Sequence, residues 1–411
     1  MTGAISARAV RASLVARREL ALVDLRDEAQ FATGHPLFAA DLPVPRVEIE
    51  APTRIPRRDT LVVLYDDAGR EGAAAIALER LGYSQVRILD GGLAAWVREG
   101  YELFRDVNSY SKAFGELVEA RRQTPSIGPE ELSGLIDSGA DIALVDVRRP
   151  DEYRTMSIRT SRNVPGGELV LRARSLAPRS ETLVVVHCAG RTRSIIGTQS
   201  LVNAGIPNRV TALRNGTIGW VLAHQTLAGG TAPPVALPSA DAVAEARGRA
   251  REVAYRAGVL RLDATEFETL SNDSTRTLYT FDVRSAEEYA VGHLPGFRHA
   301  PGGQLVQEID SFAPVRGARI VLTDTLGARA DMTASWLAQM GWDAYVLEGE
   351  IAGSLETDVP PSLPPRAIQG RYRRPYEGTD QAEAAMRGYL DWEHGLVAQL
   401  ARDRTHGFFV I

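Results

Sequence analysis

Ala143-Leu-Val-Asp-Val-Arg148 is the stretch that decides the fold of this 411-residue chain, because two variants of it occur elsewhere in the sequence. The variants are Ala21-Leu-Val-Asp-Leu-Arg26 and Tyr279-Thr-Phe-Asp-Val-Arg284. In each copy an apolar run of strand length ends in Asp-x-Arg. A Glu or Gln followed by an aromatic residue comes four positions after the arginine, as Glu152-Tyr153, Gln30-Phe31 and Glu288-Tyr289.

The similarity continues downstream with a second apolar run. Leu183-Val-Val-Val-His-Cys188 corresponds to Leu61-Val-Val-Leu-Tyr-Asp66 and to Arg319-Ile-Val-Leu-Thr-Asp324. A helix-like stretch closed by glycine and a further β-rich segment follow each run. Strands that alternate with helices over units of about 100 residues predict α/β domains with parallel sheets. The sequence therefore predicts three tandem α/β domains, each a parallel sheet flanked by helices.

Changes in composition place the boundaries between these domains. We expect domains at residues 1–105, 126–230 and 258–356, joined by a linker at 106–125 and a linker helix at 231–257. Residues 357–411 are predicted to form a Pro-rich linker, with its prolines between 360 and 365, and a helical tail with its helix at 380–402. The apolar positions of that helix are typical of packing on a domain or on a second subunit, so a homo-oligomer stays open.

The composition is that of an ordinary globular protein, with 44% hydrophobic and 24% charged residues and a net charge of −5. This balance favours neither nucleic acid nor a membrane as a partner. The longest apolar runs have strand length and the N-terminal stretch lacks a continuous apolar core, so we expect a cytoplasmic protein without a transmembrane segment. The single cysteine excludes an intrachain disulfide and a cysteine-cluster metal site, and no metal or organic cofactor is expected.

That single cysteine, Cys188, lies where the second apolar run gives way to Ala189-Gly-Arg-Thr-Arg193 and then to a helix beginning near Ser194. The end of a strand in a parallel sheet is a favoured place for a reactive group. The amides of a tight loop, the positive end of the following helix and the arginines of the loop all favour the thiolate, which is the nucleophilic form. The competing interpretation is a small cysteine buried in a core.

Asp-Val-Arg with Glu-Tyr downstream, and a strand ending in cysteine before a six-position loop closed by arginine, resemble the rhodanese homology domain over most of residues 1–356. The resemblance implies three tandem rhodanese-like domains and thiosulfate sulfurtransferase activity. In that family the cysteine attacks the sulfane sulfur of thiosulfate, expels sulfite and holds the sulfur as a persulfide, which cyanide or a thiol then removes. Cys188 is the catalytic residue that the resemblance implies.

The loop after Cys188 supplies most of the predicted substrate-binding residues. Its middle positions differ from the corresponding loops of the other two copies, and we expect Arg191 to attract thiosulfate. The closing arginine recurs in the other copies as Arg329 and Arg70, which favours a role that is at least partly structural. Glu168 is added because the turn Pro165-Gly166-Gly167 can carry it toward the loop. The predicted set is Ala189, Gly190, Arg191, Thr192, Arg193 and Glu168.

The first and third copies are predicted to be inactive, because Asp66 and Asp324 stand at the cysteine position and a carboxylate cannot form a persulfide. Two alternatives to a sulfurtransferase stay open. The whole chain could be a catalytically silent scaffold or regulatory binding protein. It could also be a cysteine-dependent phosphatase or arsenate reductase, although four residues separate Cys188 from Arg193 where phosphatases have five.

Overall fold

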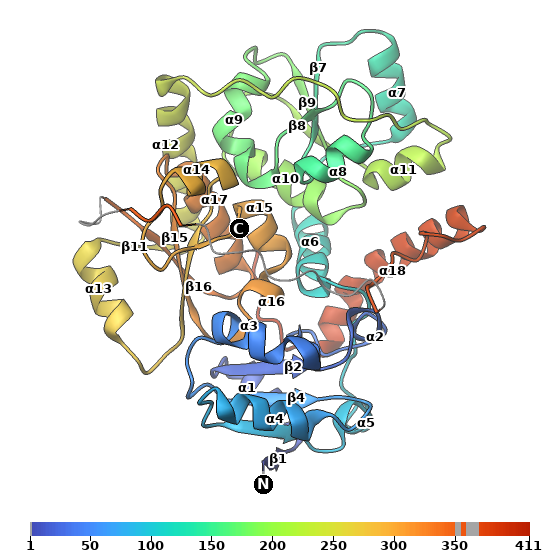
Figure 1. Cartoon of the computed structure of the whole chain (residues 1–411). Coiled ribbons are helices and arrows are strands. Elements are labelled where there is room, and N and C mark those ends of the chain that lie inside the picture. The colour runs from blue at the N-terminus through green and yellow to red at the C-terminus, as the bar shows by residue number, and fades with distance from the viewer. Residues whose placement is uncertain (1, 350–354, 359–369) are drawn as a thin grey trace.

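The structure, a computed structural model, describes residues 2–349, 355–358 and 370–411, so the predicted proline run at 360–365 lies outside the described residues. Three sheets with the same strand order, one per repeat, form the framework (Figure 1). The second sheet has the order β6 (Ser126–Ile127), β10 (Val210–Leu213), β9 (Leu183–His187), β7 (Ile142–Asp146) and β8 (Arg162–Asn163), all parallel.

The other two repeats follow this plan. In the third sheet the order is β11 (Leu260–Leu262), β16 (Asp343–Leu347), β15 (Arg319–Thr323), β12 (Leu278–Asp282) and β13 (Arg298–His299). In the first it is β1 (Gly3–Ile5), β5 (Val86–Leu89), β4 (Val62–Tyr65) and β2 (Leu20–Asp24), with β3 (Ala40–Asp41) also paired to β2. The central strands are buried on both faces, which explains why they are continuous apolar runs rather than alternating ones.

Helices cover both faces of each sheet. The first repeat contributes α1 (Ala7–Val15), α2 (Glu28–Phe31), α3 (Val47–Arg54), α4 (Glu71–Arg80) and α5 (Gly92–Arg98). The second contributes α7 (Pro129–Asp137), α8 (Pro150–Thr155), α9 (Leu169–Leu176), α10 (Thr192–Asn203) and α11 (Gly216–Leu222). The third contributes α13 (Ala264–Asn272), α14 (Ala286–Val291), α15 (Gly302–Gln307), α16 (Ile309–Phe312) and α17 (Ala328–Gln339). The predicted fold class is confirmed.

The first and third repeats are joined by more than chain connectivity. A short strand of the third repeat, β14 (Val315–Arg316), pairs antiparallel with Leu20 and Ala21 of β2 in the first sheet. Buried apolar residues of both repeats belong to one continuous cluster. Arg316 is itself buried and its guanidinium lies 4.5 Å from the ring centre of Phe38 in the first repeat. These two repeats therefore share a core.

Each of the two segments between the repeats contains a helix that packs on the domains, and so does the tail. These helices are α6 (Ser109–Arg122), α12 (Ala240–Arg256) and α18 (Ala382–Asp403). Figure 1 shows α6 in the middle of the molecule, where it contacts α10 of the second repeat and α18 of the tail. Leu396 and Leu400 of α18 reach the core of the first and third repeats. No helix in the described parts of the chain has the length and apolar character needed to cross a bilayer.

Candidate active site

The Asp-x-Arg pair closes the corresponding strand, β2, β7 or β12, in the same way in all three repeats. In the second repeat the Arg148 Nε and Nη2 atoms donate to the Asp146 carboxylate at 3.0 and 2.7 Å, and both side chains are buried. The Arg148 Nη2 also donates to the Met156 carbonyl. The repeats without cysteine contain the same pairs, Arg26 with Asp24 and Arg284 with Asp282. Since the pair does not depend on the cysteine, its role is to shape the turn.

Cys188 follows β9 directly and is buried, with 2% of its surface exposed. Its Sγ lies 3.5 Å from the Ser194 Oγ. Its carbonyl accepts a hydrogen bond of 2.9 Å from the Thr217 amide at the start of α11. Gly216 has a φ of +53°, and a Cβ at that position would lie 2.4 Å from the Cys188 carbonyl oxygen. Only glycine allows α11 to support the cysteine loop this closely.

Arg193 closes the loop and forms two hydrogen bonds with Glu152, at 2.7 and 3.0 Å. Burial alone would raise the pKa of Glu152, but the Arg193 guanidinium outweighs burial and holds that pKa at about 2. The third repeat contains the same pair, Arg329 with Glu288. The recurrence explains the Glu-Tyr motif of the sequence, because its glutamate fixes the arginine that closes the loop.

Arg191 points toward α6, and its guanidinium forms hydrogen bonds with that helix and with Asn215, the residue before α11. It donates to the Glu116 carboxylate at 2.7 and 2.9 Å, to Glu119, and to the Asn215 Oδ1 at 3.0 Å. The side chain is buried. The structure thus gives Arg191 an anchoring role for the loop, with its charge neutralised by two carboxylates, and its predicted attraction of thiosulfate stays a prediction.

Thr192 packs against α6 where that helix has a glycine. A Cβ added to Gly115 would lie 2.8 Å from the Thr192 Cγ2 and 3.3 Å from its Cα. The Thr192 Oγ1 is buried and has no hydrogen-bond partner among the described residues. An unpartnered buried hydroxyl beside the cysteine loop is available to a bound ligand.

A cavity of about 220 Å³, which we call the cysteine chamber, lies over the loop. Its lining includes all five predicted loop residues, from Ala189 to Arg193, together with Cys188. Part of α6 with the residues before it, the C-terminal segment, and Glu28, Ile218 and Gln307 of the three repeats complete its wall. The tail residues in it are Arg371, Tyr372, Arg374, Tyr376, Glu377, Tyr389 and Glu393. The sequence did not predict that the tail lines the chamber, because the apolar period of its helix indicates only the helix face that packs on the core.

Glu168 does not lie in the cysteine chamber, contrary to the expectation that its turn carries it toward the loop. It is the last residue of the short 3₁₀ turn Gly166–Glu168 and pairs with Arg172 at 3.0 Å and with Arg329 of the third repeat at 2.9 Å. The sequence could not show this position because Arg329 is far away in the chain. Glu168 therefore connects two repeats.

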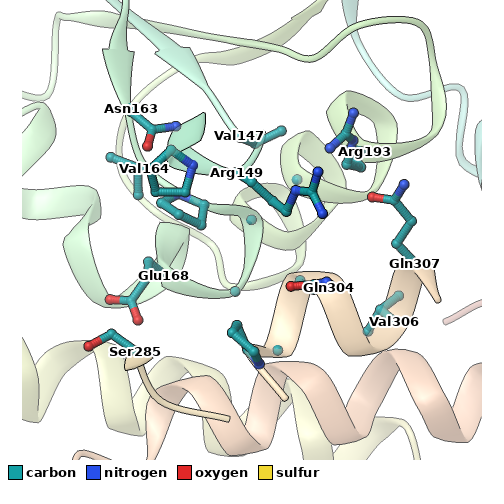
Figure 2. A pocket seen from close by; sticks show the side chains of 18 of the residues that line it. Val147, Arg149, Asn163, Val164, Glu168, Arg193, Ser285, Gln304, Val306 and Gln307 are labelled. Atoms are coloured by element: carbon teal, nitrogen blue, oxygen red, sulfur yellow. The ribbon is translucent and has the colours of Figure 1, made fainter. Parts of the chain in front are cut away.

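A second cavity, of about 790 Å³, lies between the second and third repeats, and Glu168 is part of its lining. Figure 2 shows Arg149 and Arg193 on one side of it and Gln304 and Gln307 of the third repeat on the other. It shares four lining residues with the cysteine chamber, namely Ser111, Thr192, Arg193 and Gln307. The two cavities are therefore neighbours across the closing arginine of the loop.

The corresponding loops of the other repeats contain an internal ion pair at the cysteine position. Asp66 binds Arg70 at 2.7 Å, and Asp324 binds Arg329 at 2.7 Å. The hydrogen bond from the Arg70 side chain is the main cause that lowers the pKa of Asp66 to about 2. In these two repeats a fixed carboxylate occupies the place that the thiol has in the second.

Comparisons with known proteins agree with this architecture. The family model described as the rhodanese-like domain matches residues 7–99, 128–223 and 263–355. A crystal structure of a thiosulfate sulfurtransferase from Pseudomonas aeruginosa is 45% identical, has a TM-score of 0.93 and covers 100% of both chains. The thiosulfate sulfurtransferase of Azotobacter vinelandii is 27% identical over 198 residues, which cover 43% of this chain and 72% of the relative.

A further curated thiosulfate sulfurtransferase, from Pseudomonas aeruginosa, is 30% identical over 169 residues, covering 36% of this chain and 61% of the relative. The three matches to the domain model span well over half of the sequence, and each coincides with one of the three sheets. The chain therefore belongs to the rhodanese-like domain family.

Proposed function

We propose that the protein is a sulfurtransferase that moves sulfane sulfur from thiosulfate, or a similar donor, through a persulfide on Cys188 to cyanide or a thiol. The observation that carries the proposal is the position of Cys188, a lone thiol at the carboxyl edge of a parallel sheet, in the lining of the cysteine chamber. The relatives named thiosulfate sulfurtransferase support the same reaction class.

The loading step needs no proton transfer. The Cys188 thiolate attacks the sulfane sulfur of thiosulfate, a new S–S bond forms, and the bond between the two sulfur atoms of thiosulfate breaks with its electron pair leaving on sulfite. The amides of the loop and the N-terminus of α10 stabilise the bound persulfide anion. The charge balances, since the thiolate and the thiosulfate dianion give the persulfide anion and the sulfite dianion.

The predicted binding residues are Ala189 to Arg193, to which the chamber adds Arg371 and Arg374. The Thr192 hydroxyl, which has no hydrogen-bond partner among the described residues, is available to the substrate, while the two tail arginines raise the positive charge near the donor anion. Arg191 contributes by holding the loop on α6. Glu168 is left out of the proposed substrate site, because it joins the second and third repeats.

A chamber of about 220 Å³ that tail side chains cover favours small acceptors, such as cyanide or a low-molecular-weight thiol, over a protein thiol. The described chain offers no second cysteine, so the sulfur leaves to an external acceptor and the kinetics should be ping-pong. The sequence-based division into domains 1–105, 126–230 and 258–356 is retained, with catalysis in the middle domain and none in the two that contain Asp66 and Asp324.

Mass spectrometry after incubation with thiosulfate tests the proposal. We expect the mass of the protein to increase by one sulfur atom, mapped to Cys188, and to return to its initial value when cyanide or a thiol is added. The Cys188→Ala variant should fold normally, because it removes little apolar volume, and should neither gain the sulfur nor produce thiocyanate from thiosulfate and cyanide.

Two results would contradict the proposal. Failure of the wild-type protein to gain sulfur on Cys188 from thiosulfate would favour the scaffold hypothesis. Efficient hydrolysis of an aryl phosphate that depends on Cys188, without sulfur transfer, would favour the phosphatase hypothesis.

A further inference from the structure

Glu393 of α18 faces the cysteine loop from the C-terminal tail. We propose that it is a catalytic residue of the discharge step, in which it accepts the proton of the acceptor thiol and passes it to the departing sulfur. This inference rests on the proposed function, because it assumes a persulfide on Cys188. It deepens that function by assigning the acceptor chemistry to a residue outside the rhodanese-like domain matches, which end at residue 355.

The geometry places the Glu393 carboxyl at the cysteine loop. A Cβ built on Gly190, two residues after Cys188, would lie 3.5 Å from the Glu393 Oε2, and both Glu393 and Cys188 line the chamber. Glu393 is 1% exposed. Its Oε1 accepts a hydrogen bond of 3.3 Å from the Tyr389 hydroxyl, whereas its Oε2 has no partner among the described residues.

An unpartnered carboxyl oxygen in a closed site is costly unless a ligand completes its hydrogen bonds. The oxygen of Glu393 that lacks a partner is the one that faces the loop, while the other is held by a residue of its own helix. An acceptor thiol in the chamber would supply the missing donor through its S–H group. The site is therefore built for a ligand that carries a proton.

The charged groups around Glu393 come from three elements. Lys112 and Glu116 belong to α6, Arg191 to the loop, and Asp106 precedes α6. Burial raises the pKa of Glu393 to about 7, with Glu116 and Asp106 adding to the shift and Lys112 and Arg191 opposing it. A carboxyl in this range can both accept and release a proton near neutral pH.

The discharge step balances with this proton and no further reagent. The Glu393 carboxylate takes the proton from the acceptor R–SH, and the thiolate formed attacks the outer sulfur of the Cys188 persulfide. The S–S bond to Cys188 breaks, and its electron pair restores the Cys188 thiolate. Glu393 returns the proton to the transferred sulfur, so that the product is R–S–SH. With sulfite as acceptor no S–H proton exists, and Glu393 has no such role.

Single-turnover kinetics of wild type and Glu393→Gln test this assignment. Protein loaded with thiosulfate and freed of donor is mixed either with a small monothiol or with sulfite, in weakly alkaline buffer that ionises the sulfite. For Glu393→Gln we expect thiol discharge to slow by about a hundredfold, with loading and sulfite discharge unchanged. The loss should shrink when the buffer is made alkaline enough to ionise the thiol, because the base is then not needed.

Two further variants serve as controls. Asp391→Asn removes a carboxylate from an exposed position of the same helix and should leave all three rates unchanged. Glu393→Asp retains a carboxyl group and should recover part of the thiol discharge, which keeps the test valid if the glutamine variant folds poorly.

The outcomes separate the two proposals. A wild-type protein that acquires no sulfur on Cys188 overturns the proposed function itself. Normal loading with equal thiol discharge in wild type and Glu393→Gln overturns the role of Glu393 alone. Equal slowing of thiol and sulfite discharge also overturns it, because a carboxyl that only shapes the chamber would affect both acceptors.

Discussion

The closing arginine of the loop has a different partner in the second repeat than in the other two. Arg70 and Arg329 each bind the aspartate that replaces the cysteine, while Arg193 pairs with Glu152 and the Cys188 thiol contacts Ser194. Arg329 shows that one arginine can bind both an aspartate at this position and the glutamate of the Glu-Tyr motif. The loops with an aspartate at this position thus contain their own anion, bound to the closing arginine.

We therefore expect Cys188→Asp to convert the second repeat into an inactive loop that still folds. Sulfur transfer should fall to background, while the free energy of unfolding should change by less than about 1 kcal/mol, because Arg193 can bind the new carboxylate as Arg329 does. Denaturant unfolding and a thiocyanate assay measure the two quantities. A large loss of stability would show that the second loop cannot accommodate the carboxylate.

Glu393 should make the stability of the protein depend on pH. Its folded pKa is about 7, so between about pH 4 and 7 the unfolded chain has lost a proton that the folded protein still holds. Raising the pH through this range therefore favours unfolding. Glu393→Gln should remove this effect and be more stable than wild type at pH 7 by about 2 kcal/mol, with no gain at pH 4. Urea unfolding at several pH values checks the trend.

Helix α6 approaches the cysteine loop only because Gly115 has no side chain. Gly115→Ala should push its Cβ into Thr192, at a cost of about 1 to 3 kcal/mol that the better helix propensity of alanine offsets in part. We expect lower stability and slower sulfur loading. Gly134→Ala in α7 is the matched control. A Cβ built on Gly134 has no atom within 4 Å apart from its chain neighbours and the backbone of its own helix, so this variant should be as stable as wild type or more stable. Thermal unfolding and single-turnover loading measure both variants.

In the tail helix, the sequence predicted the face that packs on the core but not the face that lines the chamber. The apolar period predicted a helix at 380–402, close to α18 at Ala382–Asp403, because that period records the face buried on the core. Glu393 lies toward the chamber, where a polar residue that serves a site follows no hydrophobic period. Cys188 and its loop could be found in the sequence because their neighbours are consecutive, whereas the contacts of Arg191 and Glu168 join residues far apart in the chain.

At the scale of the molecule, the repeats were predicted as domains in series, and the strand order within each sheet agrees with that plan. The sequence comparison did not indicate the shared core of the first and third repeats. Val315 and Arg316 form a strand too short to stand out as an apolar run, and its partner β2 is almost 300 residues away in the chain. Internal repeats reveal the copies and not the contacts between them.

Arg316 should contribute to the stability of the first and third repeats together. It donates to the Gly341 carbonyl at 3.0 Å and to the His406 carbonyl at 3.2 Å, and it lies over Phe38. We expect Arg316→Ala to lower the free energy of unfolding by about 3 kcal/mol and to reduce amide protection in the first and third repeats together. Arg80→Ala, at an exposed position of α4, should change neither. Hydrogen exchange with mass spectrometry distinguishes joint from separate loss.

Because the C-terminal segment lines the chamber of Cys188, the order in which the chain is synthesised matters for this site. Ribosomes make the cysteine loop long before residues 371–393, so a growing chain contains Cys188 before the tail that lines its chamber exists. A nascent chain, or one cleaved by a protease ahead of the tail, has the cysteine loop without the part of the chamber wall that the tail supplies. The chamber around Cys188 is thus complete only after the C-terminal segment has been made and has packed on the loop.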